Sequence, residues 1–530
     1  MKIEQCRQEI PDGGHGLMAE HKTFHRAVKW AYIMNWGEKG FSALFTFVLA
    51  SILGPRDFGM VSMAMIYVLF IQMLLNQGLF AAIIQRKDLQ PEHLDSVFWL
   101  GQATSLVLVG FSVGFSSWWA AINHLPELAR VISVLSVTVP IEGLAMVQRA
   151  ILQRDMDFKG LAIRSNGAVV AGGVIGLAMA LNGFGVWALV GQRVTEDSAA
   201  LALLWTISHW RPRWRFSLDR VRDLLGFSMA SFVNKLGDFV YSYADALFMG
   251  IFFGPVAVGL FRLAQRLVSQ ELDSATSALQ TVSFSEFSRL QDRPVELRQR
   301  VLTCVRLGSI VSLPALAGLA VSSSHLMAVL GDKWAPAADA LTILCIFGIT
   351  QALSKFTGPL LSAKSKPHLL AVLTWTVNTV SVVTLLVAAI LLKNASVPRQ
   401  ITGIALTRLA VGAGIMAPIF LFFLLRYSQM PMKNFFRAIG PSSLAACATS
   451  VGVIVLNLSG LLKGLKPTVS FVADVIVGGL TGIGSLLVLD RQLLGSIGAL
   501  ASRGLRGEET SEKTMAEYKP IASVAEVEGS

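Results

Sequence analysis

Apolar residues in this chain occur in long continuous runs that are separated by short polar segments. A run of about 18–25 apolar residues has the length of an α-helix that crosses a bilayer, and about 14 such runs can be marked. They cover residues 28–53, 60–84, 98–121, 129–150, 163–182, 185–207, 225–248, 254–280, 301–322, 338–361, 369–392, 401–425, 435–458 and 470–489. No segment alternates like a membrane β-barrel strand, so the pattern predicts an all-α integral membrane fold.

Composition rules out a soluble chain. Hydrophobic residues make up 53% of the 530 residues, charged residues only 15%, and the mean hydropathy is +0.58. A soluble chain of this length needs more charge to cover its surface. The 4 cysteines lack CxxC or metal-ligand spacing. There is no Walker A motif, metal-binding His cluster or nucleophile elbow, so we expect a protein that is not an enzyme and needs no metal or cofactor.

Lysines and arginines are distributed unevenly among the loops. With the N-terminus placed in the cytoplasm, roughly 30 fall inside and about seven outside, as the positive-inside rule predicts. The inside group includes Arg149, Arg164 and Arg437, and the outside group includes Lys333 and Lys466. An odd number of spans would spoil this alternation, so we expect both termini in the cytoplasm. The asymmetry also explains the net charge of +11 without a nucleic-acid partner.

Two similar segments lie about 200 residues apart, which suggests an internal repeat. Residues 54–59 read Gly-Pro-Arg-Asp-Phe-Gly and residues 254–259 read Gly-Pro-Val-Ala-Val-Gly, and near-equivalent lysines, Lys39 and Lys235, precede them. A unit of about six helices would place two six-helix lobes in a parallel pseudo-repeat, with an axis along the membrane normal. The alternative is that Gly-Pro loops are simply common between helices.

A basic and aromatic segment separates the two halves. Its interleaved Trp and Arg residues suit the headgroup level of a membrane and anionic lipid better than nucleic acid. The expected domains are a cytoplasmic N-terminal tail (1–27), an N-lobe (28–208), a basic amphipathic interfacial linker (209–224), a C-lobe (225–427), two additional transmembrane helices (428–495) and a disordered cytoplasmic tail (496–530).

Charged residues inside the apolar runs are the candidate functional residues. A charge in a membrane span costs several kcal/mol, so it should face water, a partner or a ligand. Arg262 and Arg266 lie four positions apart on one helix face, and two like charges there need an anion or acidic partners. A cleft lined by these arginines with Lys39 and Lys235 would suit a diphosphate, because Arg offers forked donors and Lys a point charge.

Acidic residues in the same runs are candidates for binding H⁺ or Na⁺ and coupling a transport cycle. They are Glu196, Asp197, Asp238, Asp245 and Glu271. The alternative is that these charges form internal ion pairs. Arg193 fits that alternative, because Glu196 and Asp197 follow it at i+3 and i+4.

Several motifs resemble those of Wzx-type polysaccharide flippases, within the multidrug/oligosaccharidyl-lipid/polysaccharide exporter superfamily. The resemblance covers about residues 28–430 and rests on segments 48–60, 76–89, 98–100, 158–159 and 331–334. One departure is Ser51, where the family often has Arg before the Leu-Gly-Pro turn.

The resemblance implies two six-helix lobes around a central cavity with two added C-terminal helices. It also implies flipping of undecaprenyl-diphosphate-linked glycan repeat units across the bacterial inner membrane, for lipopolysaccharide or exopolysaccharide synthesis. The partners would then be the lipid-linked oligosaccharide, membrane lipids, a polysaccharide polymerase and export machinery. Two alternatives stay open: a cation-coupled multidrug extruder of the same superfamily, and a membrane polysaccharide polymerase or glycosyltransferase. The cationic helix argues against the first, and the short outer loops argue against the second.

Overall fold

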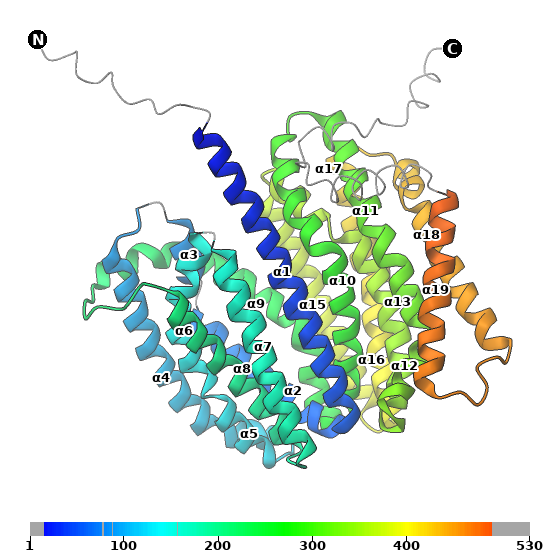
Figure 1. Ribbon diagram of the computed structural model, residues 1–530, viewed down its shortest axis with the longest axis horizontal. Helices are drawn as coiled ribbons and strands as arrows, with labels where there is room; N and C mark the ends of the chain where they lie inside the picture. Colours follow the sequence, from blue (N-terminus) through cyan, green and yellow to red (C-terminus); the bar gives the residue numbers. More distant parts are fainter. Residues whose placement is uncertain (1–14, 77–78, 87, 156, 490–530) are drawn as a thin grey trace, which may run out of the picture. The chain divides into compact units, whose positions relative to one another are not determined.

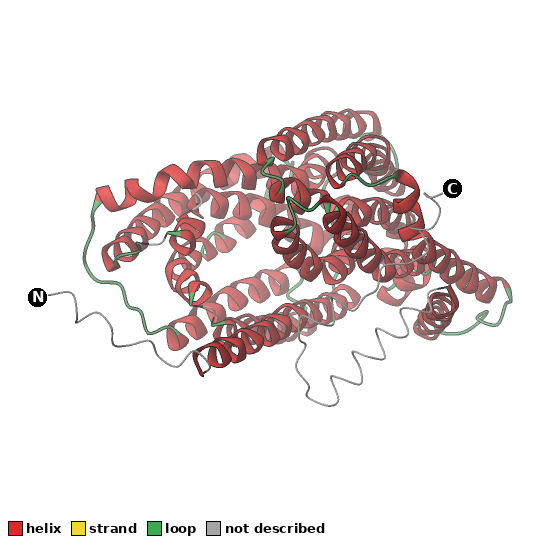
Figure 2. Ribbon diagram, turned by 90° about the horizontal axis from the view of Figure 1, so that it is seen from above, coloured by secondary structure: helices red, strands yellow, loops and turns green. Residues whose placement is uncertain are grey.

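The computed structural model describes residues 15–76, 79–86, 88–155 and 157–489 (Figure 1). All regular secondary structure in these ranges is helical (Figure 2), which confirms the all-α prediction. The predicted tails at 1–27 and 496–530 lie mostly outside the described residues. The first helix begins at residue 15, ahead of the expected start at 28.

The elements follow one another without strands throughout the described ranges. They are α1 (His15–Ile52), α2 (Pro55–Asn76), α3 (Leu79–Gln85), α4 (Pro91–Ile122), α5 (Glu127–Leu135), α6 (Thr138–Arg154), α7 (Phe158–Leu181), α8 (Val186–Ile207), α9 (Leu218–Phe253), α10 (Pro255–Arg289), α11 (Pro294–Val321), α12 (Ser323–Leu330), η1 (Asp332–Ala337), α13 (Ala338–Ser354), α14 (Thr357–Ala363), α15 (Pro367–Leu392), α16 (Val397–Val411), η2 (Gly412–Met416), α17 (Ala417–Ser428), α18 (Met432–Leu458) and α19 (Pro467–Leu489).

Eleven helical stretches in the described part of the chain are long and apolar enough to cross a membrane. The predicted spans outside this set are α1, α8 and α10. Each of these helices carries the charges noted above, such as Lys39 in α1 and Arg193 in α8. The multi-pass membrane class is therefore confirmed, whereas the count of 14 stays a prediction.

Three predicted spans are interrupted at described residues, and a proline lies at or just after each of these interruptions. Pro140 follows the break between α5 and α6, Pro359 follows the break between α13 and α14, and Pro418 follows the π-helical turn η2 between α16 and α17. A proline has no N–H to donate to the carbonyl four residues earlier, so the regular helix is interrupted there.

The chain divides into two compact units. Unit 1 comprises residues 1–263 and 385–400, and unit 2 comprises residues 264–384 and 401–530. In unit 1, α7 packs on α1 and α8, and α4 packs on α5 and α6. In unit 2, α11 packs on α13 and α18, and α19 packs on α12 and α18. The domain boundaries expected from the sequence stay predictions.

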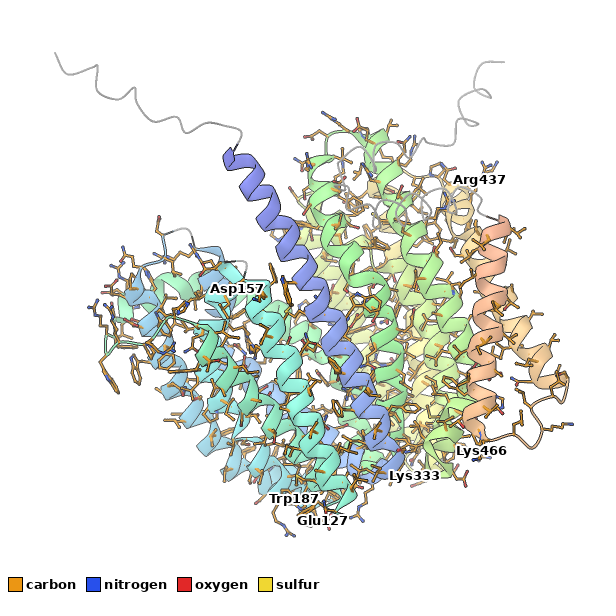
Figure 3. All side chains as sticks on the ribbon, in the orientation of Figure 1. Glu127, Asp157, Trp187, Lys333, Arg437 and Lys466 are labelled. Carbon is orange, nitrogen blue, oxygen red and sulfur yellow. The ribbon has the colours of Figure 1, made fainter. Side chains whose placement is uncertain are left out.

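Each unit has connecting loops at two opposite ends. In unit 2, Arg437 lies at one end and Lys333 and Lys466 lie at the other (Figure 3). In unit 1, Asp157 and Glu127 likewise lie at opposite ends (Figure 3). The helices of each unit therefore run between two distinct ends, as spans between two membrane faces would.

Within unit 1, the two Gly-Pro segments meet. Each follows a long helix and opens the next with Pro at the first helical position, where its missing N–H costs nothing. A Cβ atom added to Gly59 of α2 would overlap the carbonyl oxygen of Pro255, and one added to Gly259 of α10 would overlap that of Pro55. The two helices therefore cross with their backbones in contact, which only glycine permits.

Candidate functional site

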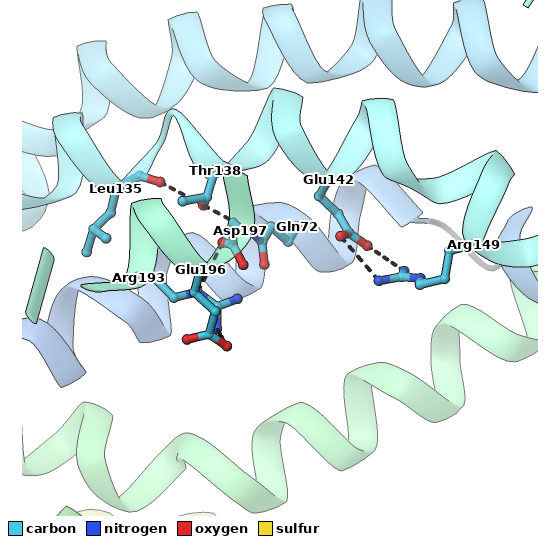
Figure 4. A network of polar contacts seen from close by, with 8 residues as sticks. All are labelled: Gln72, Leu135, Thr138, Glu142, Arg149, Arg193, Glu196 and Asp197. Atoms are coloured by element: carbon cyan, nitrogen blue, oxygen red, sulfur yellow. Dashed lines mark hydrogen bonds and ion pairs between the residues drawn. The ribbon is translucent and has the colours of Figure 1, made fainter. Parts of the chain in front are cut away.

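An ion-paired cluster lies on α8 in unit 1 (Figure 4). Arg193 donates from Nε to Asp197 Oδ2 at 3.0 Å, and its Nη1 lies 3.9 Å from Glu196 Oε1. These are the i+4 and i+3 spacings that bring helix side chains together. The predicted pairing of Arg193 is therefore present, and the positive charge of Arg193 compensates both carboxylates in part.

A second ion pair faces α8 from α6 (Figure 4). Arg149 Nη2 lies 2.5 Å from Glu142 Oε1, with both side chains mostly buried. Nearby, the Gln72 amide of α2 donates to Thr138 Oγ1 at 3.1 Å. Helices α2, α6 and α8 thus contribute polar side chains to one region of unit 1.

Arg164 of α7 joins these pairs. It is largely buried and lies within electrostatic range of Arg149, Glu142 and Asp197, and of Glu38 on α1. We call Glu142, Arg149, Arg164, Arg193, Glu196 and Asp197 the charge network of unit 1. It contains as many acids as bases, so its charges balance.

Sequence reasoning missed part of this network. Arg149 and Arg164 lie at the ends of the predicted runs 129–150 and 163–182 and were counted with the inside loops, and Glu142 was not considered. The structure places both arginines further inside helices than predicted, because α6 extends to residue 154 and α7 begins at residue 158. The spacing of Glu142 and Arg149, seven residues or two helical turns, could have revealed the pair.

Three of the four predicted diphosphate-binding residues lie in unit 1. Arg262 donates to the carbonyl of Ser242 at 3.3 Å, and its guanidinium lies 5.0 Å from the centroid of the Tyr243 ring. For Lys39 and Lys235, no hydrogen bond or ion pair is found within the part of the chain that the structure describes. Two cations in helices are thus available to an external anion or to water.

The fourth predicted residue, Arg266, lies in unit 2 and is exposed. It follows Arg262 by one turn on the same face of α10, as the sequence spacing required. The grouping of Arg266 with Lys39 and Lys235 in one cleft stays a prediction.

The other predicted coupling acids have different surroundings. Asp238 is exposed, whereas Asp245 is fully buried and accepts the backbone N–H of Ala246 at 2.7 Å. Glu271 has one buried carboxylate oxygen, Oε2, with no hydrogen-bond partner among the described residues. Glu271 is thus the candidate whose carboxylate is both shielded and incompletely satisfied.

An acid–histidine pair that sequence reasoning missed lies in unit 2. Asp474 of α19 is buried, and its Oδ2 lies 2.6 Å from Nδ1 of His325 in α12. Asp474 is an acid within an apolar span and could have been singled out on that ground. Its partner, His325, is 149 residues away in sequence, so the pair itself could not be predicted from spacing.

No group of three or more His, Cys, Asp or Glu side chains that could hold a metal is found among the residues the structure describes.

Comparison with known proteins finds related sequences. The profile of a family described as "Polysaccharide biosynthesis protein" matches residues 48–339, more than half of the chain. The succinoglycan biosynthesis transport protein ExoT of Rhizobium meliloti (strain 1021) is 28% identical over 326 residues, which are 61% of this chain and 66% of ExoT. The lipopolysaccharide biosynthesis protein WzxC of Escherichia coli (strain K12) is 25% identical over 355 residues, which are 66% of this chain and 72% of WzxC. The match to ExoT thus spans slightly less than two thirds of that relative's length.

Among solved structures, the lipid II flippase MurJ in an inward closed conformation has a similar fold. The TM-score is 0.67, with 11% sequence identity, over 87% of this chain and 100% of MurJ. At that identity the likeness concerns the fold alone.

Proposed function

Because the chain belongs to the polysaccharide biosynthesis protein family, we propose that it is a flippase for lipid-linked oligosaccharides. Its substrate is a glycan repeat unit carried on undecaprenyl diphosphate, and it moves this lipid from the cytoplasmic to the outer leaflet of a bacterial inner membrane. The product then serves lipopolysaccharide or exopolysaccharide synthesis, with a polymerase and export machinery as downstream partners.

The observation that carries this proposal is the contrast between paired and unpaired charges within helices. Arg193 is neutralised on its own helix, whereas Lys39 and Lys235 have no protein partner in the described residues. A cation in a membrane span is stable only when water, an acid or a ligand compensates it. A diphosphate headgroup has the charge and the size to do so.

The proposed architecture has 14 spans, because α1, α8 and α10 cross the membrane together with the eleven more apolar stretches. The charged residues of α1, α8 and α10 lower the mean hydropathy of these helices, but each helix is long enough to cross a membrane. The paired Gly-Pro segments support two six-helix lobes related by an internal repeat, with both termini in the cytoplasm and two further helices, α18 and α19.

Among the acids, we favour Glu271 as the residue that binds the coupling ion. Glu196 and Asp197 are already held by Arg193, so a bound cation would have to compete with its guanidinium. The buried unpartnered oxygen of Glu271 can instead accept a proton or a cation without displacing a protein group.

The test is export in cells that lack their own flippase. Lys39→Ala with Lys235→Ala should reduce surface polysaccharide by about tenfold or more, the scale of a lost charge-assisted contact, while lipid-linked intermediates accumulate inside. Arg266→Ala should act in the same direction, and Arg266→Lys should rescue only partly, because a point charge replaces a forked donor.

The matched control is Lys466→Ala, an exposed lysine outside the spans. Normal export by the double variant, at an equal level of protein in the membrane, contradicts the binding role of the lysines. Export of lipophilic cations without flipping of the lipid-linked glycan would instead identify a multidrug extruder.

A further inference from the structure

Unit 2 contains a shallow groove where α17 ends and α18 begins. Its volume is about 510 Å³, and the side chains that line it include Arg298 from the first turns of α11, with Phe422, Leu425 and Arg426 from α17. Two arginines and an apolar wall therefore share one surface depression.

The local backbone explains the shape of this groove. Helix α17 ends at Ser428, and the next residue, Gln429, adopts a left-handed conformation with φ of 51°. The Met430 N–H then donates back to the Leu425 carbonyl at 3.0 Å, and Pro431 leads into α18. Arg298 donates to the Gln429 carbonyl at 3.5 Å. The turn thus places buried Met430 in the lining and leaves Arg426 exposed.

The groove carries positive charge, and among the described residues no acid pairs with its two arginines. The chain contains no Asp or Glu between Asp339 and Asp474, so neither α17 nor α18 supplies an acid. Two acids close to Arg298 have other partners: Glu296 pairs with Arg293 at 3.4 Å, and Glu286 pairs with Arg300 at 3.5 Å. Arg298 and Arg426 are therefore available to an anion from outside the protein.

Large apolar side chains are exposed next to these cations. Phe422 of α17 is 54% exposed, and on α18 Met432 and Phe436 are 50% and 54% exposed. Lys433 and Arg437 lie on the same first turns of α18 and are also exposed. A ligand that fits this surface has an anionic head and a hydrocarbon chain.

We propose that this groove binds an anionic phospholipid of the surrounding bilayer. The phosphate lies against the guanidinium groups of Arg298 and Arg426, which offer forked donors to its oxygens. The acyl chain follows Phe422 along α17, where an exposed aromatic side chain of a membrane helix contacts hydrocarbon. This lipid is distinct from the proposed transport substrate, so the inference stands without the proposed function.

The test measures lipid binding by the purified full-length protein in detergent, by native mass spectrometry and by thermal unfolding. Phosphatidylglycerol should bind and raise the unfolding temperature, whereas phosphatidylcholine should do neither. Arg298→Gln with Arg426→Gln should weaken phosphatidylglycerol binding by about tenfold or more. The matched control is Arg289→Gln with Lys366→Gln, which removes the same charge from exposed positions of unit 2 outside the groove.

A second variant separates a lipid from a free anion. Phe422→Ser keeps both arginines and should weaken binding of phosphatidylglycerol. Inorganic phosphate should neither bind in place of the lipid nor stabilise the protein to the same extent.

Three outcomes overturn the proposal. If phosphatidylcholine binds as tightly as phosphatidylglycerol, the groove recognises hydrocarbon and not the anionic head. If inorganic phosphate stabilises the protein as much as phosphatidylglycerol does, the groove is a site for a free anion. Equal weakening by the control pair would mean that net charge, rather than this groove, attracts the lipid. Lipid retained by wild-type protein after gentle extraction, enriched in phosphatidylglycerol, supports the proposal even where a variant folds poorly.

Discussion

The charge network of unit 1 and the basic groove of unit 2 use charged side chains in opposite ways. The network contains three acids and three bases on α6, α7 and α8, and the side chains of its ion pairs are at most 33% exposed. In the groove, Arg298 and Arg426 share a surface, and among the described residues neither forms an ion pair with an acid. Compensated charges are satisfied within the protein, whereas uncompensated ones are available to a ligand. The two regions should therefore respond differently to the loss of an arginine.

The largest effect is expected from the network. Arg193→Leu removes the partner of Glu196 and Asp197 and leaves two carboxylates close together in a half-buried site. We expect a loss of about 2–3 kcal/mol in unfolding free energy, less than for a fully buried pair, because 33% of the Arg193 side chain is exposed. Thermal unfolding in detergent measures it.

A compensated variant provides the control. Asp197→Asn in the Arg193→Leu background should recover most of the lost stability, because the network then again contains as many acids, Glu142 and Glu196, as bases, Arg149 and Arg164. If the single variant unfolds like the wild type, the pairs of unit 1 do not stabilise it and the comparison fails.

A smaller effect is expected from a compensated pair of unit 2. Asp474→Ala leaves the His325 ring without its partner and opens a small space between α12 and α19. We expect a loss of about 1–3 kcal/mol, the range for a broken buried hydrogen bond. Ser485→Ala, elsewhere on α19 with only a local contact, should change little, since its hydroxyl bonds to Gly482 of the same helix. If Asp474→Ala and the wild type have the same unfolding free energy, charged pairs stabilise unit 1 but not unit 2.

The smallest effect is expected in the groove. Without added lipid, Arg298→Gln with Arg426→Gln should change the unfolding free energy by about 0.5 kcal/mol or less, because no ion pair is lost. The exposed pair Arg56–Glu127 of unit 1 offers a matched reference, since exposed pairs contribute about 0–1 kcal/mol. A destabilisation as large as that of Arg193→Leu would show that the groove arginines also hold the fold together.

Much of the fold followed from local sequence pattern. Helix class depends on runs of apolar residues, and the family assignment confirms the resemblance read from segments such as 48–60. The helix breaks before Pro140 and Pro359 were not predicted, although both prolines are visible in the sequence. The spans were marked by apolar content alone, and the missing N–H group of proline was not considered.

The site was less accessible to sequence reasoning. The pairing of Arg193 could be predicted because its partners lie one turn away on the same helix. The groove could not be predicted from the sequence, because Arg298 and Arg426 belong to different helices and come together only through tertiary packing. The same holds for His325 and Asp474. Helix spacing identifies neighbours along one element, and it carries no information on which elements pack together.

The crossing of α2 and α10 has a further consequence. Gly59 lies against the backbone of Pro255, and Gly259 lies against the backbone of Pro55. The two Gly-Pro segments therefore contact each other reciprocally. Such an isologous contact is the arrangement found on the twofold axis of a symmetric dimer, here enclosed in one polypeptide. Neither position can change alone, because a larger residue in one copy displaces the backbone of the other. Under the proposed internal repeat, the two glycines would derive from one position, and each would restrict what the other can become.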